Sequence, residues 1–533
     1  MNKTDNKKLN VLLIAIAGTS NDFLLAPAVL KAYALKDTEI KEIVQIDIKY
    51  YKRIIPEEKI QDCEMIYHDI LQQKPDVVGF SSYVWNFSSI EYLIKLIRDN
   101  NELNNLKIIL GGPEIQREDI ENGRFNENGA DYYMYGEGEI PFQELIRYLS
   151  GTNENMLRDN IPRLAYRDKD KLILSKAENG MIDVFSAPSP YLQNYVLEAV
   201  LKKSGMSVNI ETQRGCNFRC AYCLYHRNYE SIRYRNIDTV MSEFRYLKNL
   251  GVKNIRITDA NFFSNMDYAE KILEGMISEN LKMKIFAEVI PNMISEKVAK
   301  LLEKYINKFT DNDFIMGIGL QSINPNSLKS IRRSLPVKYF ELAYTRLLNA
   351  GVEIKTDIIL GLPYETFDSY MDLLEFVVDK TRLGRNIVAM SLLRILPGSD
   401  LVEIAKKEDL ILDINDNEHF VYSTPYMSIE DITKCLSYNA VISRILYSTQ
   451  LNADELRNLY FEVKDVLCVS NKELMTYMMG FFNKKLELEL SGSVYEAYRR
   501  FRYDYPHIRN PYNKIEDEII KDELKRILQR RSI

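Results

Sequence analysis

The chain has 533 residues, of which 46% are hydrophobic and 27% are charged, a composition typical of folded globular proteins. The length suffices for two or three domains, and the formal net charge of -6 gives no general electrostatic reason to bind nucleic acid or an anionic membrane. We therefore expect a small-molecule or peptide substrate as partner.

The first apolar run, residues 11–17, follows a basic amino terminus and superficially resembles a signal peptide. The run is too short for that role and turn residues follow it, so we expect a buried strand. No stretch approaches the roughly 18 to 20 apolar residues that a membrane-spanning helix needs. We therefore expect a cytoplasmic protein, in which clustered cysteines serve a metal or catalysis rather than disulfides.

Short apolar runs alternate with longer amphipathic ones over residues 1–150. The runs expected to form strands are 11–17, 43–49, 76–82, 107–112 and 130–136. Such alternation predicts a parallel sheet with helices on both faces, hence an α/β fold. Ligands of such sheets bind at loops that leave the carboxyl ends of strands, here AGTSND, SSYVWNFSS, GGPEIQ and GEGE.

Residues 151–204 are expected to connect two domains, because residues 161–176 are typical of a hairpin and SAPSPY of a linker. Between 205 and 410, six further strands are predicted, each followed by a helical stretch. They are residues 207–213, 253–259, 284–290, 314–322, 353–361 and 388–396. Six βα units in series predict an open or partial barrel whose chemistry lies at the carboxyl ends of its strands.

The last part of the chain, residues 411–533, is predicted to be helical and polar. Residues 495–512 interleave arginines with aromatic side chains, a pattern that can suit an anionic or nucleic-acid partner. The acidic run KIEDEIIKDE follows at once, so we interpret the segment as a solvated helix and loop. The isolated Cys63, Cys435 and Cys468 are expected to be small core residues.

Three of the six cysteines, Cys216, Cys220 and Cys223, lie within eight residues in the stretch RGCNFRCAYC. Thiolates at spacings of four and three can all turn toward one ion or cluster. Three cysteines leave one iron of a cubane iron-sulfur cluster without a protein ligand. Zinc would need a fourth ligand, which His226 could supply. The spacing alone leaves both metal sites open.

This loop resembles that of the radical S-adenosylmethionine (SAM) enzymes, whose C-x3-C-x2-C motif has an aromatic residue before the last cysteine, here Tyr222. The resemblance implies that the three cysteines are the catalytic residues and metal ligands, holding a [4Fe-4S] cluster whose open iron binds SAM. An electron from a donor such as flavodoxin or ferredoxin then breaks the sulfonium bond and yields a 5′-deoxyadenosyl radical.

Further stretches at the predicted strand ends resemble corresponding stretches of the same family: ITDANFF, AEVIPN, GIGLQS, IILGLPYET and LLRILPGS. The resemblance implies that polar residues in and around them hold SAM. These candidates are Tyr222, Asp259, Asn261, Glu288, Gln321, Ser322 and Arg394.

The stretches GFSSYVWN, GGPE and YGEGE resemble the flavodoxin/Rossmann-like cobalamin-binding domain that precedes the barrel in one radical SAM subfamily. The resemblance covers about residues 9–410 and implies that the cofactor's nucleotide tail lies at these strand ends. The candidate residues are Ser81, Ser82, Tyr83, Trp85, Gly111, Gly112, Gly136 and Glu137.

The predicted domains are therefore a cobalamin-binding domain over residues 1–150, a connector over 151–204, a partial (β/α)6 radical SAM barrel over 205–410, and a helical domain over 411–533. The motif D-x-H-x-x-G, which offers a histidine to cobalt in classical cobalamin domains, is absent from the sequence. The histidine of the first domain, His68, falls in a predicted helix, so we predict that no histidine ligates cobalt.

The resemblance implies a cobalamin-dependent radical SAM C-methyltransferase, which moves a methyl group from SAM through methylcobalamin to an unactivated carbon. One alternative is a cobalamin-binding radical cyclase or rearrangement enzyme. An RNA methylthiotransferase resembles the chain less well, because that family has an additional amino-terminal cysteine trio and here only Cys63 precedes Cys216. An alternative of another class is a non-catalytic binding protein stabilised by zinc at Cys216, Cys220, Cys223 and His226.

Overall fold

The structure, a computed structural model, divides into two compact units. The first contains residues 1–219, 223–287 and 396–399, and the second contains residues 220–222, 288–395 and 400–533. The residues that the structure describes are 8–18, 22–54, 58–151, 158–169, 171–177, 180–203, 205–229, 231–309, 314–333, 336–382, 386–412, 419–446, 453–486 and 511–532.

The first unit begins with a sheet of five parallel strands in the order β2-β1-β3-β4-β5. Their bounds are β1 (Leu9–Ile16), β2 (Val44–Tyr51), β3 (Val77–Ser81), β4 (Lys107–Gly111) and β5 (Tyr132–Met134). The five strands predicted for residues 1–150 are thus present. The strand order reverses at β1, between β2 and β3, which is where open sheets of this kind bind ligands.

The hairpin predicted over residues 161–176 forms as β6 (Leu164–Asp168) and β7 (Lys171–Leu174), which pair antiparallel. β6 also pairs antiparallel with β5, with Tyr132 opposite Tyr166. The hairpin therefore extends the first sheet to seven strands instead of serving only as a connector.

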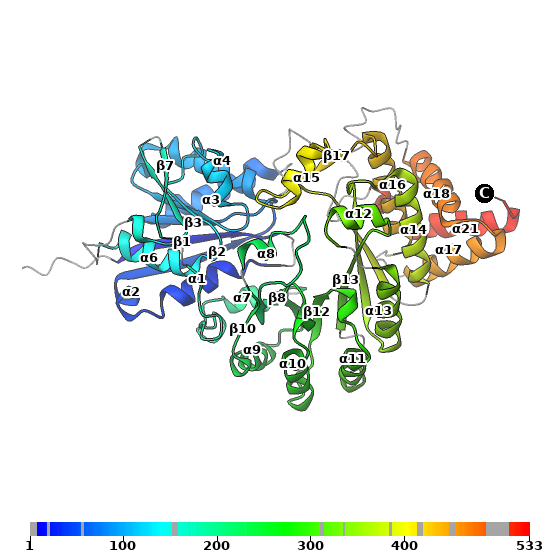
Figure 1. Cartoon of the computed structure of the whole chain (residues 1–533), viewed down its shortest axis with the longest axis horizontal. Coiled ribbons are helices and arrows are strands. Elements are labelled where there is room, and N and C mark those ends of the chain that lie inside the picture. The colour runs from blue at the N-terminus through cyan, green and yellow to red at the C-terminus, as the bar shows by residue number, and fades with distance from the viewer. Residues whose placement is uncertain are drawn as a thin grey trace, which may run out of the picture. The chain divides into compact units, whose positions relative to one another are not determined.

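Helices cover both faces of this sheet because alternate side chains of each strand point to opposite faces. Leu12 and Ile14 pack with α3 and α4, whereas Val11 and Leu13 pack with α1 and α6 (Figure 1). The helices are α1 (Ala26–Ala34), α2 (Thr38–Ile43), α3 (Lys59–Gln73), α4 (Phe87–Arg98), α5 (Arg117–Glu121) and α6 (Glu139–Leu149). His68 lies in α3, as the sequence predicted.

The first unit also holds the first βα repeats of the predicted barrel, as far as residue 287 within β12. Strands β8 (Ser207–Ile210), β11 (Asn254–Ile257) and β12 (Lys284–Val289) pair in parallel, and β9 (Gln213–Arg214) pairs antiparallel with β10 (Arg233–Tyr234). The helices here are α7 (Glu198–Leu201), α8 (Tyr225–Asn228), α9 (Ile237–Asn249) and α10 (Met266–Ser278).

The second unit continues the alternation with three parallel strands, β13 (Phe314–Gln321), β14 (Glu353–Leu360) and β15 (Asn386–Leu392). Its helices up to this point are α11 (Glu296–Phe309), α12 (Pro325–Ser330), α13 (Val337–Asn349) and α14 (Phe367–Thr381). Together with β8, β11 and β12, these strands account for all six strands predicted between 205 and 410. The α/β fold class is confirmed.

After β15 the second unit is mainly helical, as predicted (Figure 1). The helices are α15 (Leu401–Lys407), α16 (Ile429–Leu446), α17 (Ala453–Leu467), α18 (Asn471–Lys485) and α21 (Asp517–Arg530). The sequence did not indicate a short antiparallel pair, β16 (Ile411–Leu412) with β17 (Val421–Ser423). Arg444 is buried in α16 and forms a 2.6 Å ion pair with Asp517 of α21. The arginine-rich stretch over 495–510 lies outside the described residues.

A search of the described helices found none with the length and apolar character required to cross a membrane.

Candidate functional site

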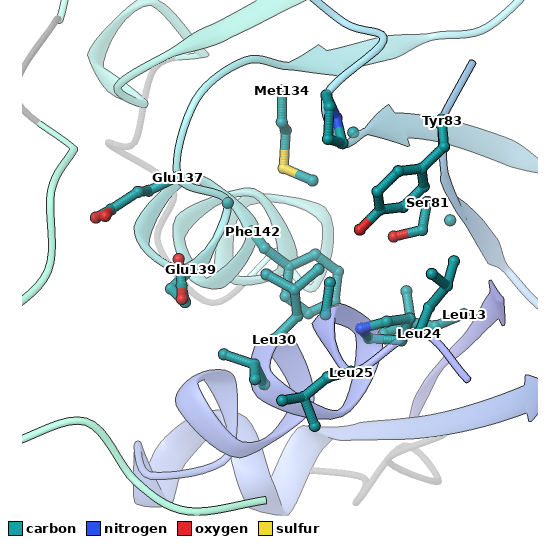
Figure 2. Close-up of a pocket in the computed structure, with 18 of the residues that line it drawn as sticks. Leu13, Leu24, Leu25, Leu30, Ser81, Tyr83, Met134, Glu137, Glu139 and Phe142 are labelled. Atoms are coloured by element: carbon teal, nitrogen blue, oxygen red, sulfur yellow. The ribbon is translucent and has the colours of Figure 1, made fainter. Parts of the chain in front are cut away.

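A cavity of about 310 Å³ lies in the first unit at the carboxyl ends of β1, β3, β4 and β5. The predicted cobalamin residues that line it are Ser81, Tyr83, Gly111, Gly112, Gly136 and Glu137. Figure 2 shows Ser81 and Tyr83 on one side of the cavity and Glu137 and Glu139 on another, with Phe142 between them. The structure thus brings six of the eight predicted residues to one cavity, where parallel strands end.

The remaining two residues, Ser82 and Trp85, do not line the cavity, but each contacts a residue that does. The Trp85 ring stacks on Tyr83, with centroids 4.4 Å apart and planes 18° from parallel. Gly18 leaves room for the indole, because a Cβ at that position would lie 3.1 Å from Trp85 Cε2. Burial raises the pKa of Tyr83 to about 12, so its hydroxyl stays protonated at neutral pH.

Ser82 joins the ends of β3 and β4 through its backbone. Its N–H donates to the Gly111 carbonyl at 2.6 Å, and its carbonyl accepts from the Glu114 N–H at 3.2 Å. Gly112 has a φ of +105°, and a Cβ there would lie 2.6 Å from the Ser82 carbonyl oxygen. Glycine is therefore required at 112 by the adjacent strand end itself, in addition to any cofactor that approaches it.

One side of the cavity carries an ionic cluster of three carboxylates and two guanidinium groups, of which Glu137, Glu139 and Arg214 are buried. Glu137 is bound by Arg233 and lies 3.5 Å from Arg214, which also contacts Glu139 at 2.7 Å and Glu211 at 2.8 Å. Burial would lower the pKa of Arg214, but Glu139 and Glu211 raise it well above its usual value. The sequence predicted only Glu137 of this set, because the pairing of charges from distant strands carries no local signal.

Arg214 lies just before the cysteine loop, whose start is fixed by Gly215. This glycine has a φ of +101°, and a Cβ there would collide with the Ser231 carbonyl. Cys220 is buried, whereas Cys216 and Cys223 are half-buried. The Tyr225 N–H donates to Cys223 Sγ at 3.4 Å.

Within the described ranges, no group of three or more His, Cys, Asp or Glu side chains is arranged to hold a metal ion.

Asp259 and Asn261, predicted to contact SAM, hold the strand that leads into the cysteine loop. The buried Asp259 carboxylate accepts from the Thr212 N–H at 2.8 Å and the Gln213 N–H at 3.2 Å, and also from the Thr212 hydroxyl. The Asn261 carbonyl accepts from Gln213 Nε2 at 2.8 Å. Their direct contact with SAM stays a prediction, and the structure adds this positioning role.

Gln321 and Ser322 lie at the end of β13, and both are buried. Gln321 has a φ of +67°, and the Ser322 hydroxyl donates to the buried Glu365. Burial raises the pKa of Glu365. This carboxyl group therefore ties the β13 end to the GLPYET loop, a contact that the sequence did not reveal.

The last two predicted SAM residues differ in exposure. Glu288, near the end of β12, is exposed. Arg394 is half-buried, with its guanidinium 4.2 Å from the centroid of the Phe420 ring. The structure does not test the SAM contact of either residue.

Arg333 is a site residue that the sequence analysis missed. Its Nη1 lies 3.5 Å from Cys220 Sγ and 3.2 Å from the Tyr222 hydroxyl, and its Nη2 donates to the Gly319 carbonyl at 2.7 Å. In the sequence it is one of two adjacent arginines in SIRRSLP, and nothing local distinguishes it from its neighbour.

Two family models match the chain: the B12 binding domain over residues 42–146 and the Radical SAM superfamily over residues 210–377. The first spans β3, β4 and β5, whose loops line the cavity, and the second begins just before the cysteine loop. The second match shows that residues 210–377 are similar to the radical SAM superfamily. The chain thus combines a B12-binding domain with a radical SAM domain, as the sequence led us to expect.

Curated relatives are similar to only part of this chain. It is 25% identical over 310 residues to the cobalamin-dependent radical SAM methyltransferase TokK of Streptomyces tokunonensis, covering 56% of this chain and 44% of TokK. It is 24% identical, with the same coverage, to the 2-(S-pantetheinyl)-carbapenam-3-carboxylate methyltransferase of Streptantibioticus cattleyicolor. The chain thus spans less than half the length of these two relatives.

Among solved structures, the fold is similar to that of the cobalamin-dependent S-adenosylmethionine radical enzyme OxsB with aqua-cobalamin bound. The TM-score is 0.65 at 16% identity, and the match covers 98% of this chain and 81% of OxsB. At this identity the likeness concerns the fold, and it extends over nearly the whole chain.

The two domain matches support the predicted cofactors, which are cobalamin, SAM and a [4Fe-4S] cluster. The residues present fit them. Cys220 and Cys223 each accept a hydrogen bond, from Arg333 and from the Tyr225 N–H, and hydrogen bonds of this kind are made to the sulfur ligands of iron-sulfur clusters. The cavity combines glycine backbone with apolar side chains, which suits the aromatic base of a nucleotide tail.

Proposed function

We propose that this chain is a C-methyltransferase that places a methyl group from SAM on an unactivated carbon of a small-molecule or peptide substrate. One observation carries the proposal. The cavity lined by the B12-binding strand ends is also lined by Asn209, Glu211, Arg214 and Thr258, which belong to the first strands of the radical SAM domain or the loops after them. A single cavity therefore contacts both cofactor-binding parts of the chain.

When bound, the iron-sulfur cluster supplies the electron that cleaves SAM, and cobalamin supplies a carrier for the methyl group. The chain's own residues hold and orient these groups. Cys216, Cys220 and Cys223 would ligate the cluster, and the ionic cluster around Arg214 anchors the start of their loop to Glu139 and Glu211. A reaction between two bound groups requires that the protein hold both of them in fixed positions.

The names of TokK and of the carbapenam methyltransferase support methyl transfer, although they describe proteins of which this chain matches 44%. The substrate's class and the electron donor, flavodoxin or ferredoxin, belong to the same proposal. We also propose a cytoplasmic location, because the cysteine loop needs reduced thiols and the cytoplasm keeps thiols reduced.

The proposal is tested by anaerobic reconstitution of the full chain with iron, sulfide and hydroxocobalamin, followed by reduction in the presence of SAM. We expect both 5′-deoxyadenosine and S-adenosylhomocysteine, measured by mass spectrometry, because the proposed reaction consumes one SAM in each way. Deoxyadenosine without S-adenosylhomocysteine would contradict methyl transfer and favour the cyclase or rearrangement alternative. Neither product, with zinc bound and no iron, would favour the binding-protein alternative.

A further inference from the structure

Arg333 lies in the second unit, against the middle of the cysteine loop. Its guanidinium makes three contacts, to Cys220 Sγ at 3.5 Å, to the Tyr222 hydroxyl at 3.2 Å and to the Gly319 carbonyl at 2.7 Å. Two of these groups are neutral oxygens. Among the side chains that the structure describes, no carboxylate forms an ion pair with Arg333, so the sulfur of Cys220 is the contact that can carry a compensating negative charge.

The backbone around Arg333 holds it in this position. Its N–H donates to the Leu328 carbonyl at 2.8 Å, which closes the end of α12, and the Ala221 N–H donates to the Ile331 carbonyl at 3.0 Å. The segment before Arg333 is thereby attached directly to the segment between Cys220 and Tyr222. The contact does not depend on one long side chain finding its partner.

Gly319 provides the space for the guanidinium. A Cβ at residue 319 would lie 2.7 Å from Arg333 Nη2, closer than real side-chain carbons approach other atoms. The absent side chain lets the Gly319 carbonyl accept from Nη2 while Nη1 reaches Cys220. The planar fork of arginine makes both contacts at once, which the single ammonium of lysine cannot reproduce.

We propose that Arg333 is a positioning residue that raises the reduction potential of the iron-sulfur cluster through its hydrogen bond and positive charge at Cys220. Reduction adds one electron and hence one negative charge to the cluster. A cation and an N–H donor at a ligating sulfur stabilise that added charge, and hydrogen bonds to cluster sulfurs are a recognised determinant of potential. The proposal rests on the cluster assignment but not on methyl transfer.

The test compares wild type with Arg333→Met and Arg333→Gln, each reconstituted with iron and sulfide as the full chain without SAM or substrate. Iron content and the midpoint potential, from a redox titration followed by electron paramagnetic resonance, are measured for each. We expect wild-type iron content in both variants and a midpoint potential shifted to more negative values. Arg333→Gln, which keeps N–H donors but loses the charge, should shift less than Arg333→Met.

Arg332→Met is the matched control. Arg332 is the adjacent arginine, its side chain is 54% exposed, and it pairs with Asp400 instead of a cysteine. The Arg332→Met variant should leave the midpoint potential at the wild-type value, because a solvent-exposed charge that is already paired with Asp400 is largely compensated and screened.

Three outcomes would overturn the proposal. The first is a wild-type potential in both Arg333 variants at full iron content. The second is an equal shift in Arg332→Met. The third is loss of iron from both Arg333 variants with unchanged circular dichroism, because Arg333 would then retain the cluster instead of tuning it. Failure of the proposed methyl transfer would leave this measurement unaffected, since no SAM is present.

Discussion

Asp259 shows how one buried group ties the stability of the cysteine loop to pH. Its carboxyl group is 2% exposed, and burial raises its pKa from 3.8 to about 7 despite the hydrogen bonds from Thr212 and Gln213. The folded state therefore holds this proton more tightly than the unfolded state does. The resulting contribution to stability is complete below pH 3.8 and is lost as the pH rises through 7.

Asp259→Asn removes this titration while keeping an oxygen that can accept from the two N–H groups. We expect the variant to gain stability relative to wild type as the pH rises from 4 to 8. The relative gain should be on the order of 4 kcal/mol, since a shift of about three pKa units corresponds to roughly 1.4 kcal/mol each. Urea unfolding of the full chain at both pH values measures it, and a difference that does not change with pH would contradict the assignment.

Asp465→Asn serves as the control at the same scale. Asp465 is exposed, and its hydrogen bond from Arg382 lowers its pKa. The stability that a lowered pKa contributes is complete above the unfolded value of 3.8 and is lost only as the pH falls through the folded value, so Asp465→Asn should show almost no change in relative stability between pH 4 and pH 8.

At the scale of elements, the ends of β3 and β4 depend on Gly112. Gly112→Ala places a Cβ 2.6 Å from the Ser82 carbonyl at a φ of +105°. The positive φ costs about 1 to 2 kcal/mol for a residue with a side chain, and the clash adds about 1 to 3 kcal/mol. We expect a less stable chain that retains less cobalamin, measured by unfolding and by absorbance after gel filtration.

Gly151→Ala separates the two causes. Gly151 also has a positive φ, +72°, but a Cβ there would have no neighbour within 4 Å. This variant should lose only the conformational part of the stability and retain cobalamin as wild type does. Equal cobalamin retention by both variants would show that the clash with Ser82 does not shape the cavity.

The elements were largely predictable, whereas the contacts between them were not. The parallel strands of both sheets were visible because their apolar residues form short runs before helical patterns, as in residues 76–82 and β3, whereas the short pair β16 and β17 was not. The attachment of the hairpin to β5 requires a choice of pairing partner that periodicity does not contain. The same is true of Asp259 with Thr212, 47 residues apart, and of Arg333 with Cys220, 113 residues apart. The cysteines and the cavity loops could be identified by their resemblance to known motifs, because their function requires particular residues at short, fixed spacings in the sequence.

At the scale of the whole molecule, the cofactors are assigned to separate segments of the chain. The B12-binding match ends at residue 146, and the cysteine loop begins at Cys216 within the radical SAM match. Among the described residues that line the cavity, none is a cysteine of that loop. The residues proposed to bind cobalamin therefore do not include the cluster ligands.

Cys220→Ala should accordingly separate the two cofactors. We expect its iron to fall from about four atoms per chain to background, because a cubane cluster held by three cysteines does not persist on two. SAM cleavage should be lost with it, whereas cobalamin should remain bound at the wild-type ratio, as measured by metal analysis and by the absorbance of the purified chain. Cys468→Ala is the matched control, since Cys468 is exposed, contrary to the prediction that it is a core residue, and lies far from this loop in the sequence. Wild-type SAM cleavage in Cys220→Ala would refute the ligand assignment, and a joint loss of cobalt and iron would refute the independence of the two sites.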